Sequence, residues 1–253
     1  MPWDPHRYEQ FKAERYVPFE DLVKLVRVRP GLQVIDLGCG TGELTRRLAD
    51  LLPESDVLGI DSSAEMLAQA AQLARPGLHF EQRTIEEVDG AYDLVFSNAA
   101  IQWVRDHESL VPRLLGLVRP GGQLVVQLPS NHAHPTQTTI RELAGEPPFR
   151  EALGGWSWDW PVLVVEAYAA LLYVSGAADM TVFEKVYPHV LDDADALADW
   201  MSGTALVPYF ERLPDGLRAQ FVERYRERLR ALYPSRPVFF GFRRILFAAT
   251  RPA

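Results

Sequence analysis

The sequence predicts an α/β fold in which a doubly wound, mostly parallel sheet is covered by helices and extended by a helical cap. Three observations support this prediction. Apolar runs rich in β-branched residues alternate with helical patterns in the first half of the chain, three glycines follow the first run, and the alternation stops after Pro129. Strands that alternate with helices indicate a parallel sheet with helices on both faces.

The composition fits one domain with a sizeable core. The chain has 253 residues, of which 47% are hydrophobic, which leaves room for an added subdomain. Its 26 Lys and Arg against 34 Asp and Glu give a formal charge of −8, so neither nucleic acid nor a membrane surface is expected as a partner. No signal peptide or membrane-spanning run is visible, and the single cysteine, Cys39, cannot form an intrachain disulfide. We therefore expect a cytoplasmic protein.

The alternating elements follow one another along residues 30–130, the predicted cofactor-binding half. Strands are predicted at 33–37, 56–60, 92–97 and 123–128, and helices at 43–52, 63–74 and 107–118. Ser62 and Glu65 match a capping box that opens the second helix, and Pro53 ends the first. The turn at residues 120–122, Pro-Gly-Gly, separates the third helix from the fourth strand.

The second half of the chain has a different pattern. Helices are predicted at about 163–174, 193–202 and 215–233, and strands at 180–191 and 238–250. We assign the two late strands to the core sheet, and segments 131–178 and 192–235 to a helical cap for an acceptor molecule. No linker separates these parts, so residues 1–253 are predicted to form a single domain.

The stretch VIDLGCGTGEL at residues 34–44 places three glycines between a strand and a helix. A phosphate loop of the nucleotide triphosphatases needs Lys followed by Ser or Thr, but Glu43 and Leu44 follow the last glycine. The dinucleotide fingerprint needs a glycine where Glu43 stands, and a carboxylate at a helix start repels a pyrophosphate. Gly38, Gly40 and Gly42 therefore suit a ligand without phosphate.

Asp61 ends the second predicted strand, nineteen residues after Gly42. A carboxylate at this place can accept both hydroxyl hydrogens of a ribose. A ribose without a pyrophosphate points to an adenosine derivative, and S-adenosylmethionine is the first choice. The simpler interpretation of Asp61 is a helix N-cap, although Ser62 or Ser63 could serve there. Asp36 is expected to accept hydrogen bonds from its own loop or to face a ligand ammonium group through water.

Four segments resemble the motifs of class I S-adenosylmethionine-dependent methyltransferases: VIDLGCGTG, LGIDSSAEMLAQA, DLVFSNAAIQWVRDH and VRPGGQLVVQLPSN. The opening WDPHRYEQFKAERYVPFEDLV and the late ADWMSGTALVPYFERL further resemble the trans-aconitate 2-methyltransferase family. The resemblance implies a Rossmann-like doubly wound sheet of seven strands, mostly parallel with one antiparallel strand. It also implies a small-molecule methyltransferase that uses S-adenosylmethionine and esterifies a carboxylate.

The resemblance assigns cofactor contacts along the first half of the chain. The three glycines would lie against the methionine part, Asp61 at the ribose, and Ser62 and Met66 near the adenine. Ile85 would follow the third strand of the family's fold, which precedes the strand predicted at 92–97. The resemblance implies an acidic residue there that contacts the adenine amino group. This chain has Thr84 instead, so Glu86 or a backbone carbonyl could make the contact. The complete expected set is Tyr8, Arg15, Asp36, Gly38, Gly40, Gly42, Asp61, Ser62, Met66, Ile85, Asn98, Ala99 and Trp103.

A lid is expected over residues 1–28. Trp3, Tyr8 and Phe11 share one helical face, and Arg15 could pair with the cofactor's carboxylate. A permanently packed helix explains the same spacing equally well. No metal site is expected, because the pair of histidines at residues 132 and 134 lacks a third ligand at a fitting distance in the sequence.

The expected acceptor is a small molecule, most simply a carboxylic acid. An ionised carboxylate needs no general base to attack a sulfonium methyl group, but a dry pocket must hold it with a cation or strong donors. The resemblance supplies the candidates for acceptor binding: Gln102, Trp103, Tyr187, His189, Trp200, Tyr209 and Arg244. Packing would explain each of these residues as well. Arg244 is preferred over Arg243 because neighbours on a strand face opposite sides, and Arg244 is the one that matches the position implied by the resemblance.

One departure from the family pattern bears on the acceptor. The family has Gly-Leu-Arg-Pro-Tyr where this chain has ALVPY, so Val207 replaces an arginine. An acid with fewer carboxylates than trans-aconitate is therefore expected to be the better acceptor. An acyl-carrier-linked acid, a phenol or a carbon nucleophile stays open as the acceptor, and so does a non-catalytic binding module. We expect a monomer or a weak dimer.

Overall fold

The structure is a computed structural model that describes the backbone of residues 12–253 and the side chains of residues 16–253. The expected lid residues Trp3, Tyr8 and Phe11 lie outside the described residues, as does the side chain of Arg15. The chain divides into two compact units, which we describe separately. The core unit comprises Ala13–Ser130, Pro161–Lys185 and Arg244–Ala253, and the helical unit comprises Asn131–Trp160 and Val186–Arg243.

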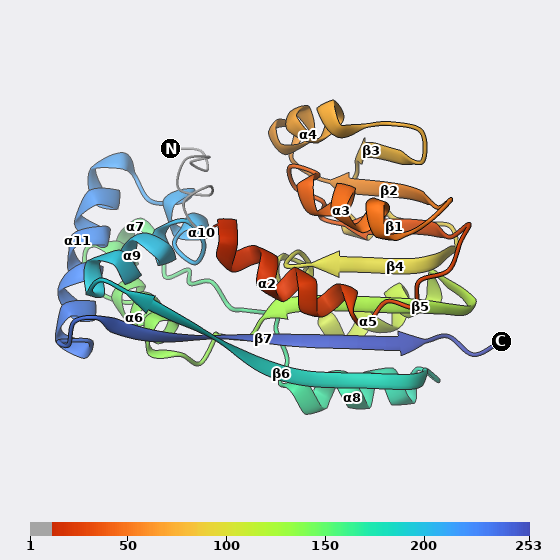
Figure 1. Cartoon of the computed structure of the whole chain (residues 1–253). Helices are drawn as coiled ribbons and strands as arrows, with labels where there is room; N and C mark the ends of the chain where they lie inside the picture. The colour runs from red at the N-terminus through yellow and green to blue at the C-terminus, as the bar shows by residue number, and fades with distance from the viewer. Residues whose placement is uncertain (1–11) are drawn as a thin grey trace. The chain divides into compact units, whose positions relative to one another are not determined.

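Strands and helices alternate through the core unit as far as β5 (Figure 1). The elements are α2 (Lys12–Val23), β1 (Gln33–Leu37), α3 (Glu43–Leu51), β2 (Asp56–Asp61), α4 (Ala64–Ala70), η1 (Ala71–Leu73), β3 (Leu78–Gln82), η2 (Ile85–Glu87), β4 (Tyr92–Asn98), η3 (Ile101–Trp103), α5 (His107–Gly116) and β5 (Val118–Pro129). The predicted strands at 33–37, 56–60 and 92–97 agree with β1, β2 and β4 to within one residue.

Seven strands form one sheet in the order β3-β2-β1-β4-β5-β7-β6. The pairs β1–β2, β2–β3, β1–β4 and β4–β5 are parallel. Strand β7 (Val238–Thr250) pairs antiparallel with β5, and its arrow in Figure 1 points against those of β4 and β5. The predicted seven-stranded, mostly parallel sheet with one antiparallel strand is confirmed.

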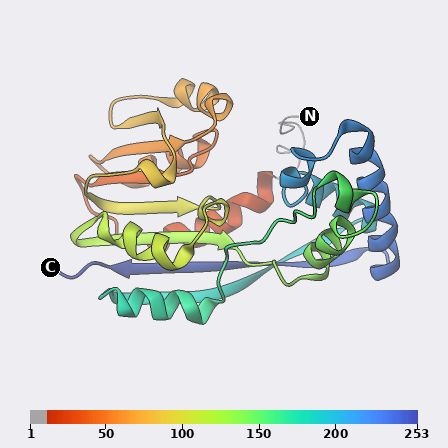
Figure 2. The ribbon, with the colours of Figure 1, turned by 180° about the vertical axis from the view of Figure 1, so that it is seen from behind.

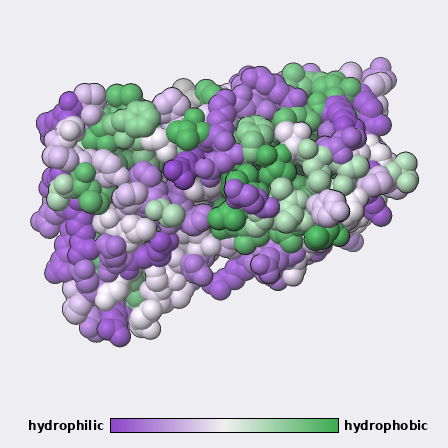
Figure 3. Space-filling view, turned by 90° about the horizontal axis from the view of Figure 1, so that it is seen from below, coloured by the Kyte–Doolittle hydropathy of each residue, from purple (hydrophilic) through white to green (hydrophobic). Residues whose placement is uncertain are grey.

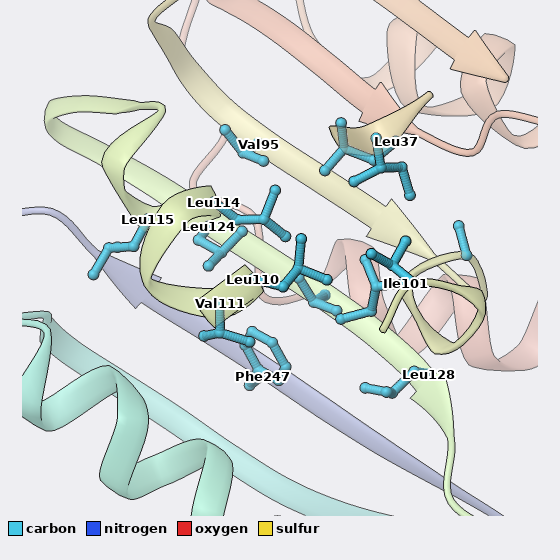
Figure 4. Packing of buried hydrophobic residues seen from close by; sticks show 14 of the residues in the cluster. Leu37, Val95, Ile101, Leu110, Val111, Leu114, Leu115, Leu124, Leu128 and Phe247 are labelled. Atoms are coloured by element: carbon cyan, nitrogen blue, oxygen red, sulfur yellow. The ribbon is translucent and has the colours of Figure 1, made fainter. Parts of the chain in front are cut away.

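Helices cover both faces of the sheet in the core unit. Figures 1 and 2 show α2 and α3 on one face, and α5 and α8 (Val165–Val174) on the other. Figure 4 shows leucines of α5 packed against β4, β5 and β7, where Leu114, Val95 and Phe247 are at most 1% exposed. Burying each such side chain contributes about 1.5–3 kcal/mol to folding.

Helix α2 is packed on the sheet through the described part of its length. Phe19 and Leu22 are fully buried, and the ring of Phe19 meets that of Phe96 edge to face at 6.1 Å. The hydroxyl of Tyr16 donates to Glu43, the first residue of α3. One face of α2, which includes Phe19 and Leu22, therefore packs against the rest of the core unit.

Two details of the core unit differ from the predictions. Helix α4 is capped by Ser63, whose Oγ accepts from the backbone N–H of Met66, so the predicted capping box of Ser62 is wrong. Strand β5 begins at Val118, before the Pro-Gly-Gly turn, and its pairing with β4 shifts register between Tyr92 and Leu94. A Cβ at Gly122 would lie 2.6 Å from the carbonyl oxygen of Asp93, so the chain can pair there only without a side chain.

Helix α8 has apolar residues on both of its sides. Tyr168 and Leu172 are fully buried, while Tyr173 and Val174 are 72% and 74% exposed. Figure 3 shows apolar side chains gathered in the region of this helix. Among the described residues, no helix combines the length and the apolar content that a membrane span requires.

The helical unit packs short helices around its own core. Its helices are α6 (Pro135–Ala144), α7 (Phe149–Ala152), α9 (Ala194–Ser202), α10 (Val207–Phe210) and α11 (Asp215–Leu232). Phe149, Phe221 and Tyr225 are fully buried at its centre, with the rings of Phe149 and Phe221 4.8 Å apart. The strands β6 (Ala178–Leu191) and β7 each contribute residues to both units.

Candidate active site

The loops that follow β1, β2 and β4 meet at the carboxyl edge of the sheet, which is where ligands bind in open α/β folds. The N–H of Gly40, after β1, donates to Asp61 Oδ2 at the end of β2 over 2.9 Å. A Cβ at Gly38 would lie 2.2 Å from the Cβ of Ala100, after β4. The three loops are therefore in direct contact, and the close approach at Gly38 requires glycine.

The three glycines of the first loop differ in what surrounds them. Gly38, Gly40 and Gly42 have φ values of +75°, +55° and +77°, in the left-handed region that favours glycine. A Cβ at Gly42 would lie 2.8 Å from the ring of Phe80, whereas one at Gly40 would meet no described atom within 4 Å. Gly40 therefore faces open space in which a ligand can approach the backbone.

The carboxylate of Asp61 is held in place by two backbone groups. Its Oδ1 accepts from the N–H of Ser63 over 2.8 Å, and its Oδ2 accepts from Gly40. Each carboxylate oxygen keeps a further lone pair for a ligand hydroxyl. Both interpretations of Asp61 are compatible with this geometry, because it shapes the loop and presents a fixed acceptor. Its role at a ribose stays a prediction.

Asp36 is buried beneath the glycine loop. It is 4% exposed, and Thr45 in α3 donates its hydroxyl to Oδ2 over 2.6 Å. The bonded partner is thus a side chain, where backbone groups of the loop were expected. Burial raises the pKa of Asp36 to about 7, with a smaller upward effect from Asp61, although the Thr45 hydrogen bond opposes it. The carboxyl group can therefore change its charge near neutral pH.

Cys39 packs in the loop and is no nucleophile. Burial raises the pKa of its thiol well above the ordinary value, and the charges of Asp36 and Asp61 raise it further. A Cβ at Gly59 would lie 2.9 Å from the Cβ of Cys39, so the thiol fits because the neighbouring strand has no side chain there.

The segment after β3 is fixed by its own polar contacts. The hydroxyl and N–H of Thr84 both donate to Glu87 Oε2 over 3.0 Å and form a capping box. Arg113 donates to the carbonyl oxygens of residues 85, 86 and 88. Ile85 is 9% exposed and belongs to the hydrophobic core. Thr84 thus caps a turn where the resemblance implies an acidic residue, and the adenine contact of Ile85 stays a prediction.

The turn after β4 is clamped in a strained conformation. Ala99 has a φ of +56°, which costs a non-glycine residue about 1–2 kcal/mol. Its N–H donates to the carbonyl of Gln127 over 2.8 Å, and its carbonyl accepts from Gln102 Nε2 over 2.7 Å. Trp103 is 42% exposed and therefore lies at the surface of the core unit, not in its core. Such strain, held by surrounding bonds, is common where a turn serves a ligand.

A buried histidine supports this turn from behind. His107 is 1% exposed, with Nε2 2.9 Å from the carbonyl oxygen of Ile101 and Nδ1 2.5 Å from the hydroxyl of Tyr168. A carbonyl only accepts, so Nε2 carries the proton and Nδ1 accepts from Tyr168. Burial lowers the pKa of His107. The sequence predicts His107 only as an N-terminal helix residue, which it is, but not its burial, because the burial depends on α8, sixty-one residues away at Tyr168.

Gln127 and Arg244 form a polar pair at the carboxyl end of β5. Gln127 is fully buried and Arg244 is 8% exposed, and Arg244 Nη1 donates to Gln127 Oε1 over 3.2 Å. Asn98 is the register partner of Gln127 on β4, and Leu246 is its partner on β7. Side chains on paired positions share a face, so Asn98, Gln127 and Arg244 lie on the same side of the sheet. The sequence analysis selected Asn98 and Arg244 but missed Gln127.

The other acceptor candidates belong to the helical unit. Tyr187 and Trp200 are 4% and 7% exposed, and the ring of His189 lies 4.7 Å from that of Trp200. Tyr209 is 2% exposed, and its hydroxyl accepts from the N–H of Trp158 over 3.1 Å. These contacts assign all four residues a place in the packing of this unit. Their roles toward an acceptor stay predictions.

The opposite end of the sheet has a cavity whose polar residues Asp93 and Gln123 are already bonded within the fold. The cavity, about 160 Å³, is lined by Arg27, Leu32, Asp93, Gln123 and their neighbours. Asp93 accepts from the N–H of Gln33 and from Arg119, and both ends of the Gln123 amide are bonded to the backbone. The polar groups here complete the fold, and the candidate site stays at the carboxyl edge.

Comparisons with known proteins show what the whole chain is similar to. A family model described as a methyltransferase domain matches residues 29–158. The trans-aconitate 2-methyltransferase of Deinococcus radiodurans is 48% identical over 258 residues, covering 100% of this chain and 99% of that protein. The protein of the same name from Variovorax paradoxus is 37% identical, covering 93% of this chain and 92% of that protein.

Solved structures share the fold at low sequence identity. The YcgJ protein of Bacillus subtilis has a TM-score of 0.64 at 14% identity, covering 94% of this chain and 99% of that one. Phosphoethanolamine N-methyltransferase 2 of Haemonchus contortus, solved with S-adenosyl-L-methionine, has a TM-score of 0.56 at 16% identity, covering 94% of this chain and 53% of that one.

Proposed function

Because the chain belongs to the trans-aconitate 2-methyltransferase family of S-adenosylmethionine-dependent methyltransferases, we propose that it esterifies a carboxylate of a small organic acid. Bound S-adenosylmethionine supplies a methyl group on a sulfonium, which an ionised carboxylate attacks without a general base. The chain's own residues must then bind both molecules, align the carboxylate and exclude water.

The loops after β1 and β2 are proposed to hold the cofactor. Gly40 offers backbone in open space, and Asp61 presents a fixed acceptor for ribose hydroxyls. Asp36 can ionise near neutral pH, which favours a cationic ligand. These three features fit S-adenosylmethionine, a cofactor that has no phosphate. The remaining cofactor positions proposed are Tyr8, Arg15, Gly38, Gly42, Ser62, Met66, Ile85, Asn98, Ala99 and Trp103.

Arg244 is the observation that supports a carboxylate acceptor. Arg244 is 8% exposed, and its Nη1 donates to a neutral amide at Gln127. A cation in so dry a place favours an anionic ligand, and its parallel donors match the two oxygens of a carboxylate. Val207 stands at the start of α10, where the resemblance to the family implies an arginine. We therefore propose that acids with fewer carboxylates than trans-aconitate are the better acceptors.

A panel of acids with isotopically labelled S-adenosylmethionine, read by mass spectrometry, tests the proposal. Trans-aconitate, a dicarboxylic acid and a monocarboxylic acid are each assayed with the wild type and with Arg244→Ala. The variant should lose about a hundredfold or more in turnover, since a charged hydrogen-bonded pair contributes about 3 kcal/mol. Arg244→Lys keeps the charge without the fork and should recover part of the activity.

Arg243→Ala is the matched control, since Arg243 is the exposed neighbour on the same strand. It should keep wild-type turnover, and all three variants should bind S-adenosylhomocysteine normally. Full turnover by Arg244→Ala would remove Arg244 from the acceptor site. Turnover confined to neutral acceptors would move the protein to phenols or carbon nucleophiles and leave the cofactor unaffected.

A further inference from the structure

We propose that Gln127 orients the acceptor: its carbonyl oxygen fixes Arg244, and its Nε2 donates to the carboxylate of the acceptor. This inference rests on the proposed function, because it names a further specificity-determining residue for the same reaction. Gln127 lies on β5, two residues before the strand ends at Pro129.

The orientation of the Gln127 amide follows from its partner. A guanidinium has only donors, so the atom that faces Arg244 Nη1 at 3.2 Å must be the carbonyl oxygen. This fixes the flip of the amide, which otherwise would be assigned by convention. The NH2 group is consequently directed away from Arg244 Nη1. Gln127 therefore combines an acceptor for the cation with a donor for something else.

That donor is buried without a partner among the described residues. Gln127 is fully buried, and its Nε2 has no hydrogen bond within the part of the chain described. Two further buried amide oxygens in the same state, Asn98 Oδ1 and Gln102 Oε1, belong to the end of β4 and to the turn that follows. An unsatisfied buried polar group costs about 1–3 kcal/mol, so a ligand that satisfies it recovers that free energy.

The donors match a single carboxylate. Arg244 supplies a cation and Gln127 Nε2 supplies a neutral donor, whereas the unpartnered atoms of Asn98 and Gln102 are oxygens and can only accept. A neutral N–H holds a carboxylate oxygen less strongly than a guanidinium does, so the oxygen that it holds keeps more of its nucleophilicity. Two different donors would thus distinguish the two oxygens of the acceptor.

A structural explanation competes with this one. Asn98 and Gln127 are register partners on adjacent strands, so a small rotation could let Nε2 of one bond Oδ1 of the other. The two amides would then stabilise the sheet and would have no role toward an acceptor. The two explanations predict different outcomes when the Nε2 donor is replaced by a carboxylate oxygen.

Gln127→Glu is the variant that separates them. It keeps an oxygen for Arg244, removes the Nε2 donor and adds a negative charge beside the proposed carboxylate. Gln123→Glu is the matched control on the same strand, because Gln123 is 7% exposed and bonds Arg27 N–H and the Leu25 carbonyl. Each purified variant is assayed with trans-aconitate and a dicarboxylic acid, with melting temperature and S-adenosylhomocysteine affinity measured in parallel.

For Gln127→Glu, we expect acceptor kcat/KM to fall about a hundredfold or more, mainly through KM, from the lost bond to a charged group and the added repulsion. Its melting temperature and S-adenosylhomocysteine affinity should stay near those of the wild type. Gln123→Glu should show the opposite result, with a lowered melting temperature and an unchanged acceptor KM.

Wild-type acceptor kinetics in Gln127→Glu would overturn the inference. So would a fall in melting temperature as large as that of Gln123→Glu with an unchanged acceptor KM, since the amides would then serve each other. Failure of the proposed function looks different, because the wild type would then methylate no carboxylic acid at all. Acid turnover that depends on Arg244 but not on Gln127 would reject this inference alone.

Discussion

Two buried glutamines of β5 differ in how completely their side-chain amides are hydrogen-bonded. Near the amino end, Gln123 is bonded through both ends of its amide to the backbone of residues 25 and 27. Near the carboxyl end, Gln127 uses only its oxygen, and its Nε2 has no partner among the described residues. The residues have the same chemical type, are four positions apart and are almost equally buried.

The comparison extends to the neighbouring strands. At the amino end of β4, Asp93 accepts from a backbone N–H and from Arg119. At the carboxyl end of β4, Asn98 Oδ1 is buried without a described partner, and Ala99 is held with a positive φ. One end of the sheet thus uses its polar groups to complete the fold. The other keeps polar groups available at a cost in stability, as ligand sites commonly do.

The largest effect is expected from two glycines at opposite ends of β1. Gly31 and Gly38 have similar φ values of +72° and +75°, but only an added Cβ at Gly38 meets another atom, Ala100 Cβ at 2.2 Å. Gly31→Ala should cost about 1–2 kcal/mol from backbone strain alone. Gly38→Ala adds overpacking of about 1–3 kcal/mol and should also abolish cofactor binding.

Urea unfolding measures the free energy of unfolding of each variant, and calorimetry with S-adenosylhomocysteine measures its affinity at the cofactor site. Equal losses of stability in the two variants, or normal cofactor binding by Gly38→Ala, would mean that the contact between the loops after β1 and β4 is unimportant.

The aspartates at the two ends of β2 provide the second test. Asp61 is bonded by Gly40 and Ser63, whereas Asp56 pairs with His79 over 3.2 Å at the exposed amino end. Asp61→Ala should lower cofactor affinity about ten- to a hundredfold, the value of a hydrogen bond to a charged group. Asp56→Ala should leave affinity unchanged and cost at most about 1 kcal/mol of stability. Unchanged affinity in Asp61→Ala would reduce Asp61 to a structural role in the loop.

The third test is a pH dependence that arises at Asp36. Its pKa of about 7 in the fold lies above its ordinary value of 3.8, so its contribution to stability is complete below pH 3.8. The contribution is lost as pH rises toward 7, by at most about 1.4 kcal/mol per pH unit. His107 acts in the opposite sense, because burial lowers its pKa and the stability of the fold then decreases as pH falls below 6.5.

Asp36→Asn isolates the carboxyl contribution. The difference in unfolding free energy between this variant and the wild type should change between pH 4 and 7, while the His107 contribution cancels. Binding of S-adenosylmethionine to the wild type should release a proton near pH 7, which calorimetry in buffers of different ionisation enthalpy detects. A pH-independent difference would show that Asp36 has the same pKa in the folded and unfolded states.

Local pattern was sufficient to predict most of the sheet but not the contacts made across it. Strands β1, β2 and β4 are short apolar runs, and their bounds follow from the residues themselves. Strand β3 was less visible, because Leu78 is its only buried residue. Helix α4 begins at Ala64 with Ser63 as its N-cap, and the N–H of Ser63 is bound by Asp61, a contact that two adjacent serines in a sequence cannot specify.

The candidate site shows the same limit. Gly38, Gly40, Gly42 and Asp61 follow from motif spacing, because the ends of consecutive parallel strands meet at one edge. Gln127 was missed because it lies inside an apolar strand. Its proposed role toward the acceptor depends on Arg244, which is 117 residues away in the sequence and belongs to the antiparallel partner strand β7. His107 depends in the same way on a hydroxyl of α8.

The most direct test of the difference between the two ends of β5 is NMR of the two glutamine side-chain amides. The NH2 signals of Gln123 and Gln127 would be assigned in 15N-labelled protein with S-adenosylhomocysteine, and trans-aconitate or the best dicarboxylic acid would then be added. The account predicts that the Gln127 signal shifts as the acid binds while the Gln123 signal does not move. An unmoved Gln127 signal at an acid concentration that saturates turnover, or equal shifts of both signals, would contradict it.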